Sequence, residues 1–593
     1  MPVRQVLLVV ALVQVLRSII VSLRVHLLHQ VVEVHLEAVA LQVVVAHLVV
    51  VEVEAVDRFL CVMTKLFWDM KKYFVFAVLA LATMPATAQE TFENANIATG
   101  DLNGTARYVG MGGAMDALGG DISTINTNPA GIGIFRKSNI SMSFGLVNQQ
   151  DAQSFSNGNT TNASFDQLGF VWANQMDRDN YVNFAFNYHK SRNFNYILHA
   201  ADKITDGAGM TAVTCLKGVD GILYPLRNDG SPDFTKNPSW ECNQLDYVLM
   251  DLVWNGTNWG YYDTKSYTMD RSTKGYISTF DFNISGNMNN RIFWGITVGV
   301  HNVDYQHYGV YHENLKGNDI NVPLEYNLEV HDDRTITGTG ADIKFGIIVR
   351  PIEESALRFG LSVSTPTWYD LKTRNNTYIK DFGGTFTNGD TYRSSTAPCE
   401  NFSHEFKLYT PWKFNLSAGH TIGSNLAMGL GFEYADYSKL DTRYDVGGVW
   451  DNETESDEAM NRHTEKALRG VSTLKAGLEF KPAPELAVRF GYNYVSPMYK
   501  SYFKDGAVSS EGTSVASALD FTNWDATHRI TCGLGCQLDN WNFALAYQYQ
   551  TQKGKFEPFY YESLNDENLI AGADKITVKN QRHQLLFTVG YTF

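Results

Sequence analysis

A Gly-rich stretch is the first feature that could carry chemistry. Gly110, Gly112 and Gly113 lie close together, and such a run can cradle a phosphate when a strand precedes it and a Lys-Ser/Thr pair follows. The sequence pattern here offers neither. Interleaved apolar residues such as Met111 and Met115 instead indicate a packed segment, because glycines this dense allow close approach of backbones.

Metal and haem chemistry has two further candidates. His301, His307 and His312 could bracket a metal ion or haem, but a strand end and a loop are expected there and the spacing fits no ligand pattern. The acidic run 451–458 could bind Ca²⁺, but it lacks EF-hand spacing and is interpreted as a solvated loop. No Ser-His-Asp arrangement is evident. The sequence therefore predicts no catalytic residue, no metal site, no cofactor and no enzyme activity.

Cysteines offer one structural alternative. Cys215 and Cys242 share a long polar segment and could form a disulfide in an exported protein. Cys532 and Cys536 occupy positions i and i+4 of an expected strand, which places them about 13 Å apart and beyond disulfide reach. They are interpreted as small apolar surface residues.

Composition excludes several classes of protein. The 593 residues include 48 Lys and Arg against 63 Asp and Glu, a net charge of −15, and a nucleic-acid partner needs a basic face. Aromatic residues make up 13% and charged residues only 19%, which argues against disorder. Frequent Gly, Tyr and Phe with scarce Pro favour many β-strands.

The first 88 residues are not expected to be part of the mature protein. Residues 1–69 are rich in Val and contain no Gly, and are interpreted as a non-native upstream extension; a cytoplasmic extension or helical anchor is the alternative. Residues 70–88 have the basic start, short apolar run and A-x-A site of a secretory signal peptide. A single cleavage is expected after Ala88 of the site Ala86-Thr87-Ala88, which makes Gln89 the mature N-terminus.

The C-terminus has the clearest pattern. Leu585, Phe587, Val589, Tyr591 and Phe593 alternate with small or polar residues, which places the large apolar set on one face of a strand. A final aromatic residue in mid-strand is the signature of the closing strand of a bacterial outer-membrane barrel, which the barrel assembly machinery recognises.

The same alternation recurs along the chain, with tight and long connections in turn. An even strand count with short turns at one end and long loops at the other is typical of a membrane barrel, because closure pairs every backbone group in hydrocarbon. The fourteen expected strands are 138–149, 164–174, 180–190, 275–287, 290–303, 336–350, 356–365, 406–421, 424–437, 470–481, 485–497, 526–538, 540–553 and 581–593.

The sequence therefore predicts an all-β protein: a transmembrane antiparallel β-barrel of about 14 strands over 137–593, with an N-terminal hatch at 89–136 that plugs the lumen. A soluble β-sandwich or lipocalin-like barrel is the alternative, but such proteins usually have shorter strands and lack the terminal Phe. The expected location is the outer membrane of a Gram-negative-type bacterium, in contact with outer-membrane lipid.

The expected hatch contains two motifs, with the residues Gly110, Gly112, Gly113, Asn128, Pro129, Ala130 and Gly131. Together with a middle hairpin (Gly346 to Pro366), these motifs resemble the FadL/TodX family of outer-membrane transporters for long-chain fatty acids and other hydrophobic compounds. The resemblance covers 89–593, assigns the motif residues to seating or gating the plug, and implies a barrel of fourteen strands.

The resemblance implies passive uptake of hydrophobic small molecules such as fatty acids. Ligand would pass from extracellular loops to an apolar pocket, then leave sideways into the bilayer through a kink in the third strand, within about 180–190. The alternative is a barrel that transports nothing and whose loops act as an adhesin or receptor, haemin binding included. Trimming 191–274 would distinguish the two.

Overall fold

The structure, a computed structural model, describes residues 91–593 apart from 206, 238–241, 243, 317–324, 383, 386–390, 393–394, 399–401, 447–452, 501–519, 564 and 566–567. The predicted upstream extension and the signal peptide, with Ala86, Ala88 and Gln89, lie outside these residues and stay predictions.

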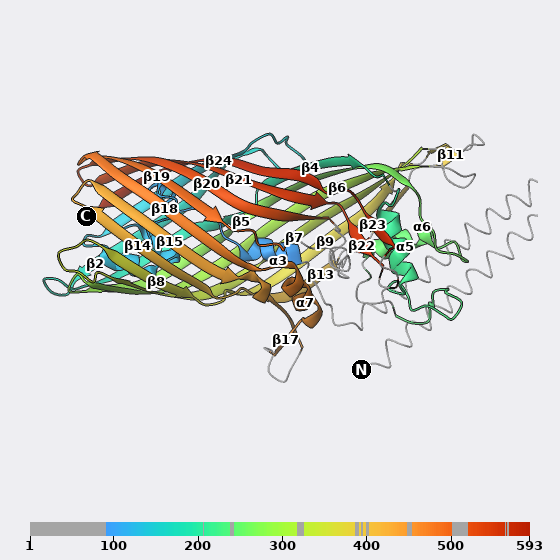
Figure 1. Ribbon diagram of the computed structural model, residues 1–593, viewed down its shortest axis with the longest axis horizontal. Coiled ribbons are helices and arrows are strands. Elements are labelled where there is room, and N and C mark those ends of the chain that lie inside the picture. The colour runs from blue at the N-terminus through green and yellow to red at the C-terminus, as the bar shows by residue number, and fades with distance from the viewer. Residues whose placement is uncertain are drawn as a thin grey trace, which may run out of the picture. The chain divides into compact units, whose positions relative to one another are not determined.

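One antiparallel sheet closes on itself (Figure 1). β1 (Asn139–Gln149) pairs with β2 (Thr161–Gln175) on one side and with β24 (Ile576–Thr592) on the other, so the first and last strands complete the cylinder. The predicted 14-stranded antiparallel barrel is confirmed. The count follows the ring of pairings and treats β3–β4, β8–β9, β13–β14 and β15–β16 as interrupted single strands.

The remaining barrel strands are β3 (Tyr181–Asn193), β4 (Tyr196–Lys203), β5 (Thr264–Met288), β6 (Ile292–Lys316), β7 (Glu325–Val349), β8 (Arg358–Ser364), β9 (Trp368–Asp381), β13 (Phe402–Tyr409), β14 (Lys413–Ile422), β15 (Leu426–Asp436), β16 (Asp441–Asp445), β18 (Gly470–Ala483), β19 (Leu486–Val495), β20 (Phe521–Leu538) and β21 (Trp541–Glu557). Short strands in the connections are β10 (Gly384–Thr385), β11 (Thr391–Tyr392), β12 (Ser395–Pro398), β17 (Thr454–Ser456), β22 (Tyr560–Glu562) and β23 (Ile570–Gly572).

The outer wall carries an apolar band next to the short turns. On β6 the outward positions Ile292, Ile296, Val298 and Val300 are exposed and apolar. The run measures about 27 Å along the strand at 3.4 Å per residue, or roughly 20 Å along the axis at a tilt near 40°, close to the height of a bilayer-facing band. Large apolar side chains left open to this extent need hydrocarbon around them.

Above the band the outward face turns polar while the strands continue. Asn302 and Asp304 follow Val300 on β6 and point outward, whereas Val303 and Tyr305 point into the lumen and are buried. The prediction of a long connection at 304–335 was wrong for this reason. The alternation changes sign where the wall leaves the membrane layer, so the outward apolar signal disappears although pairing to β7 persists.

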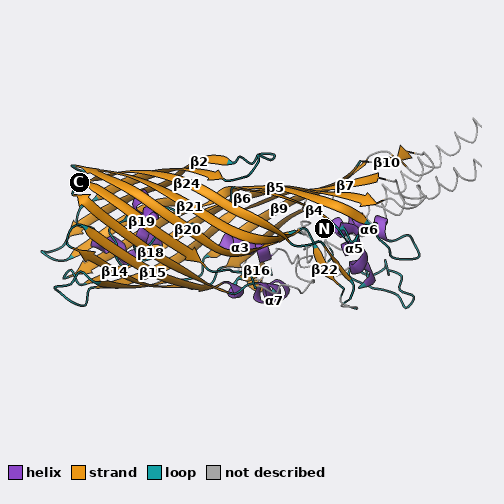
Figure 2. Cartoon of the chain, turned by 45° about the horizontal axis from the view of Figure 1, so that its top comes forward, coloured by secondary structure: helices purple, strands orange, loops and turns teal. Residues whose placement is uncertain are grey.

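The lumen is filled at three levels. Near the short turns lie α4 (Ala106–Gly110), η1 (Ile122–Asn126) and η2 (Pro129–Ile134), and higher up lies α3 (Thr91–Ala98), visible inside the barrel in Figure 2. At the long-loop end, α5 (Met210–Val219) and α6 (Gln244–Val253) contribute to a hydrophobic cluster with the inner faces of β5, β6 and β7. Two loop elements, η3 (Tyr437–Lys439) and α7 (Glu458–Ala467), complete the described part. No helix among the described residues is both long enough and apolar enough to cross a membrane.

Candidate functional site: a plugged lumen with an unpaired wall

The hatch is built from short helices with side-chain caps. Asn128 precedes η2 and its Oδ1 accepts from the backbone N–H of Ala130 at 3.2 Å, while Pro129 takes the first helical position. Proline fits there because that N–H has no helical partner. Thr105 and Asp121 cap α4 and η1 in the same way. Asn128 and Pro129 therefore start a capped local helix, and the role in seating or gating that the resemblance assigned to them stays a prediction.

Barrel glycines leave room for this turn. A Cβ at Gly346 would overlap Asn128 Oδ1, and one at Gly295 would overlap the Pro129 carbonyl. Ala130, fully buried, packs with the wall residues of β6 and β7. Within the hatch, Gly131 makes a similar close contact, because a Cβ at this position would overlap Thr124. Hatch and wall are thus in backbone contact.

The second glycine motif meets the opposite wall. Gly112 and Gly113 have φ of 63° and 77°, a region that favours glycine. Gly112 lies against the backbone of Tyr492, and Gly110 lies 3.3 Å, measured from its would-be Cβ, from the Cα of Gly533. The predicted motif residues therefore come together in one plug, but Gly110–Gly113 and Asn128–Gly131 contact different strands.

Ion pairs that the sequence analysis did not single out hold the plug. Arg107 of α4 donates from Nε and Nη2 to the two carboxylate oxygens of Glu479, both at 2.9 Å, and Arg489 donates to the same carboxylate at 2.6 Å. Lys475 forms an ion pair with Asp116 of the hatch at 3.2 Å. The available signal was the set of charged residues interleaved with the apolar face of β18 and β19.

α3 is anchored higher in the lumen. Glu93 Oε1 accepts from the Tyr305 hydroxyl at 2.9 Å and contacts His307 Nδ1 at 3.1 Å, and Thr91 Oγ1 lies 2.6 Å from His463 Nδ1. Burial alone would raise the pKa of Glu93, but the hydrogen bond and charge of His307, with nearby arginines, lower the pKa from 4.5 to about 2. His307 therefore lies within strand β6 and serves as an anchor for α3, in place of the predicted loop position. Among the described residues no cluster suited to a metal ion occurs.

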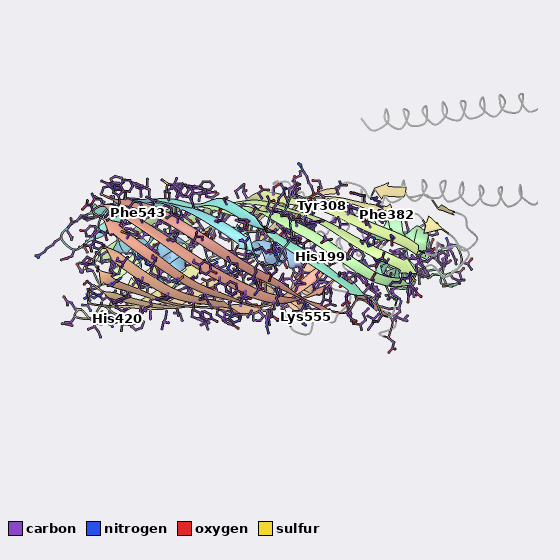
Figure 3. All side chains as sticks on the ribbon, turned by 90° about the horizontal axis from the view of Figure 1, so that it is seen from above. His199, Tyr308, Phe382, His420, Phe543 and Lys555 are labelled. Atoms are coloured by element: carbon purple, nitrogen blue, oxygen red, sulfur yellow. The ribbon has the colours of Figure 1, made fainter. Side chains whose placement is uncertain are left out.

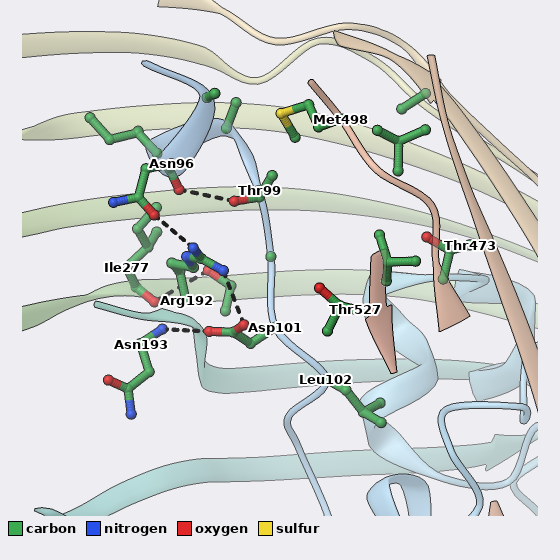
Figure 4. Close-up of a pocket in the computed structure, with 18 of the residues that line it drawn as sticks. Asn96, Thr99, Asp101, Leu102, Arg192, Asn193, Ile277, Thr473, Met498 and Thr527 are labelled. Atoms are coloured by element: carbon green, nitrogen blue, oxygen red, sulfur yellow. Dashed lines mark hydrogen bonds and ion pairs between the residues drawn. The ribbon is translucent and has the colours of Figure 1, made fainter. Parts of the chain in front are cut away.

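A cavity of about 430 Å³ lies between α3, the hatch and the wall (Figure 4). Leu102, Ile277 and Met498 contribute apolar surface, whereas Arg192 and Asp101 contribute charge. The prediction of an apolar pocket is met on one side of the cavity only. The lining suits a molecule with both an apolar and a polar part.

Asp101 occupies the charged side of this cavity. Its carboxylate lies 3.0 Å from Arg192 Nη1 and 3.5 Å from Arg529 Nη2, and it accepts from the backbone N–H of Asn193 at 2.9 Å. Burial alone would raise its pKa, but Arg192, Arg529 and Arg582 lower it. Asp101 is thus a charge-paired residue of the strap that joins α3 to α4.

The wall beside this strap is incompletely paired. β2 pairs with β1 from Thr161 onward, but it pairs with β3 only from Gln167 to Gln175. Above His189, β3 pairs with β5 alone, and its register shifts between Lys190 and Arg192. In this fully described part of the chain, two strand edges therefore face each other without ladder hydrogen bonds.

Asn103 bridges the two unpaired edges. Its Nδ2 donates to Asp166 Oδ1 of β2 at 3.1 Å and to the Lys190 carbonyl of β3 at 3.0 Å. Asp101 N–H donates to the Ser191 carbonyl at 2.8 Å just above. The strap thus supplies hydrogen bonds that a neighbouring strand would otherwise supply.

The predicted closing residues lie at the seam of the barrel. Val589 pairs with Met142 of β1, and Phe587 and Tyr591 pair with Phe144 and Ile140. Phe593 donates its backbone N–H to the Ser138 carbonyl at 3.0 Å, and its ring lies 6.3 Å from that of Phe170. Recognition of this end by assembly machinery stays a prediction.

The predicted loop cysteines, Cys215 and Cys242, are both buried at the long-loop end. A disulfide between them stays a prediction.

Fold and site together define a membrane-spanning β-barrel whose lumen contains the packed N-terminal segment, with a cavity of mixed polarity and a break in its wall. No protein-family model matches the chain, and no curated protein matches it.

Solved structures that resemble it include a Pseudomonas aeruginosa FadL homologue (12% identity, 84% of this chain and 99% of that chain covered, TM-score 0.46). The Pseudomonas putida toluene transporter TodX (10%, 84% and 99%, 0.39) and the Ralstonia pickettii toluene transporter TbuX (10%, 83% and 98%, 0.41) are similar to the same extent. These proteins belong to the group that the sequence resemblance indicated.

Proposed function

We propose that this protein is an outer-membrane transporter for the passive uptake of hydrophobic molecules such as long-chain fatty acids, which pass through the lumen cavity and leave sideways into the bilayer. The unpaired stretch between β2 and β3 is the observation that carries the proposal. It borders the cavity through Asp101 and Asn103, and it begins at the height of Phe144 and Leu146, which are exposed on the outer band.

A sideways route suits the chemistry of such a molecule. An acyl chain is stabilised by about 0.8 kcal/mol per CH₂ in apolar surroundings, and an aqueous path to the periplasm would forfeit that stabilisation. The hatch lies across the straight path, held by Arg107–Glu479 and Lys475–Asp116. Movement of the strap 99–103 alone would free the wall without ejecting the hatch.

The proposal places the short turns on the periplasmic side and the long loops outside the cell. Both described ends of the barrel chain, Asn139 and Thr592, then lie on the periplasmic side, which suits secretion followed by insertion from that side. Mature-chain numbering from Gln89, assembly through the C-terminal strand and contact with outer-membrane lipid belong to the same proposal.

A cysteine pair at Asn103 and Asp166 tests the route. Their side chains are in hydrogen-bond contact, so oxidation of the Asn103→Cys, Asp166→Cys variant would fix the strap across the gap. We expect cells that lack their own fatty-acid transporter to take up labelled oleate when they express the wild-type protein. The oxidised variant should lose at least about tenfold of that uptake, and a reductant should restore it.

The matched control places the cross-link in a fully paired wall, at Asn283 and Thr297 of β5 and β6, whose side chains are also in contact. This oxidised control should transport like wild type. Equal uptake by both oxidised variants would disprove the sideways route. If the wild-type protein restores no uptake at all, the transport proposal fails and the loop-mediated adhesin or receptor remains.

A further inference from the structure

A basic surface lies on the outer wall where β21 and β24 leave the apolar band. Lys553 and Lys555 of β21 and Lys579 of β24 are exposed and point outward. Lys553 and Lys579 are direct cross-strand partners, an arrangement in which like charges destabilise a sheet. Lys555 donates to Thr577 Oγ1 at 2.7 Å, and none of the three forms an ion pair within the described part of the chain.

The height of these lysines follows from the aromatic rim below them. Tyr547 and Tyr549 lie at the top of the apolar band, with His583 2.7 Å from the Tyr547 hydroxyl, and rings of this kind mark the membrane interface. Lys553 is four residues beyond Tyr549, or about 10 Å higher at 3.3 Å per residue and a tilt near 40°. Figure 3 shows Lys555 well along the barrel from Phe543 on the same strand. Lysine side chains can reach back toward the interface from this level.

Other parts of the same layer carry acids. Asp304 of β6, Asp333 of β7 and Asp370 of β9 point outward and are exposed. The acid nearest to the basic surface in the strand register is Asp525, in the bulge of β20 opposite Lys553, and no ion pair joins the two. Other basic side chains also point outward, such as Arg374 of β9 and Lys274 of β5, but β21 and β24 carry three exposed lysines on adjacent strands.

Protection of an unpaired strand edge is a simpler role, but it explains only one of these lysines. Lysine on an unpaired edge discourages pairing with another chain, and β24 has no β1 partner beyond Arg582. That explains Lys579. It does not explain Lys553 and Lys555, because β21 pairs with β20 on one side and with β24 on the other.

We propose that Lys553, Lys555 and Lys579 form a docking surface for the phosphate groups of an outer-leaflet glycolipid. A phosphate placed between Lys553 and Lys579 would remove their mutual repulsion, and the apolar band below would accept the acyl chains of the same molecule. The inference rests on the outer-membrane placement proposed above but not on transport.

Purified full-length protein in detergent would be titrated with diphosphorylated lipid A and with lipid A stripped of phosphate. We expect the K553Q/K555Q/K579Q variant to bind diphosphorylated lipid A at least about tenfold more weakly than wild type. Phosphate-free lipid A should bind both proteins equally and weakly. The matched control is K372Q/K407Q/K439Q, since each of these lysines already pairs with an acid.

Heat-modifiable mobility on gels would show that each variant is folded. Unchanged affinity in the test variant, an equal loss in the control variant, or equal binding of the two lipids by wild type would overturn the proposal. Phosphate-dependent binding in a protein that restores no oleate uptake would support this surface and reject transport, so the two proposals fail separately.

Discussion

At the scale of single residues, the hatch packs closely against the wall because the wall residues at the contact are glycines, which have no side chain. The turn at Asn128 and Pro129 depends on residue types alone, because the cap and the ring act locally. The sequence did not predict that Gly346 of β7 lies against that turn. Such a contact joins segments more than two hundred residues apart, and no local pattern reports it.

Gly346→Ala should therefore displace the turn. The added Cβ would overlap Asn128 Oδ1 and lie 2.9 Å from Pro129 Cδ, and overpacking of this kind costs about 1–3 kcal/mol. We expect faster hydrogen exchange over 126–134 and a larger conductance in planar bilayers. Gly260→Ala is the matched control, since nothing lies within 4 Å of its would-be Cβ. The same behaviour in both variants would contradict the close fit.

The anchoring of α3 should depend on acidity. The pKa of Glu93 is lowered from 4.5 to about 2 in the folded protein, so the stability that its carboxylate contributes is present above pH 4.5 and is lost as the pH falls toward 2. We expect the hydrogen-exchange protection factors of α3 to fall over this range relative to those of α4. Glu93→Gln should lower α3 protection at pH 7 and remove most of the acid dependence. An identical acid profile in that variant would contradict the role of Glu93.

At the scale of elements, the strands that face lipid were predicted well and those beyond it poorly. β6 was expected to end at 303 and runs to Lys316, while the start of β7 was expected at 336 and lies at Glu325. Outward apolar residues supply the period-two signal only inside the band. Above it, the strand is held by pairing and by inward residues such as Tyr305, which look like loop aromatics when the sequence is read without the partner strand.

Arginine substitutions on the outward face can locate the lower edge of the polar wall. Ile296 and Asn302 both point outward from β6, the first at the middle of the band that runs from Ile292 to Val300 and the second just above its top. We expect Ile296→Arg to destabilise the barrel by about 2–4 kcal/mol and Asn302→Arg by about 0–1 kcal/mol. Urea unfolding from lipid vesicles would measure both. Equal effects would show that the membrane layer is placed elsewhere.

At the scale of the whole molecule, closure of the barrel was predictable because the strands that pair to close it lie at the two ends of the chain. The alternation that ends at Phe593 predicted a closing strand, and β24 pairs with β1 along eleven residues. The plug was predicted from glycine density, whereas the unpaired wall was not located beyond a kink near 180–190. The register shift at Lys190–Arg192 lies at the end of that range.

Phe593→Ala should lower the yield of inserted barrel more than it lowers the stability of barrels that have formed. The ring lies over Tyr591 and Phe170 at the seam, and the last strand is the one that must find β1. The fraction of heat-modifiable protein in cell envelopes would measure the yield. Phe543→Ala, a lipid-facing change on β21, is the control. Equal yields in the two variants would contradict a special role for the terminal ring.

The glycines opposite the hatch have a consequence for how the pore can open. With residues 91–134 removed, the steps at Gly295 and Gly346 would face an empty lumen, and the charges of Glu479 and Lys475 would lose their hatch partners. The vacant cylinder would therefore lack contacts that the filled cylinder has. On the transport route proposed above, a ligand would pass through small displacements of the strap while the hatch stays in place.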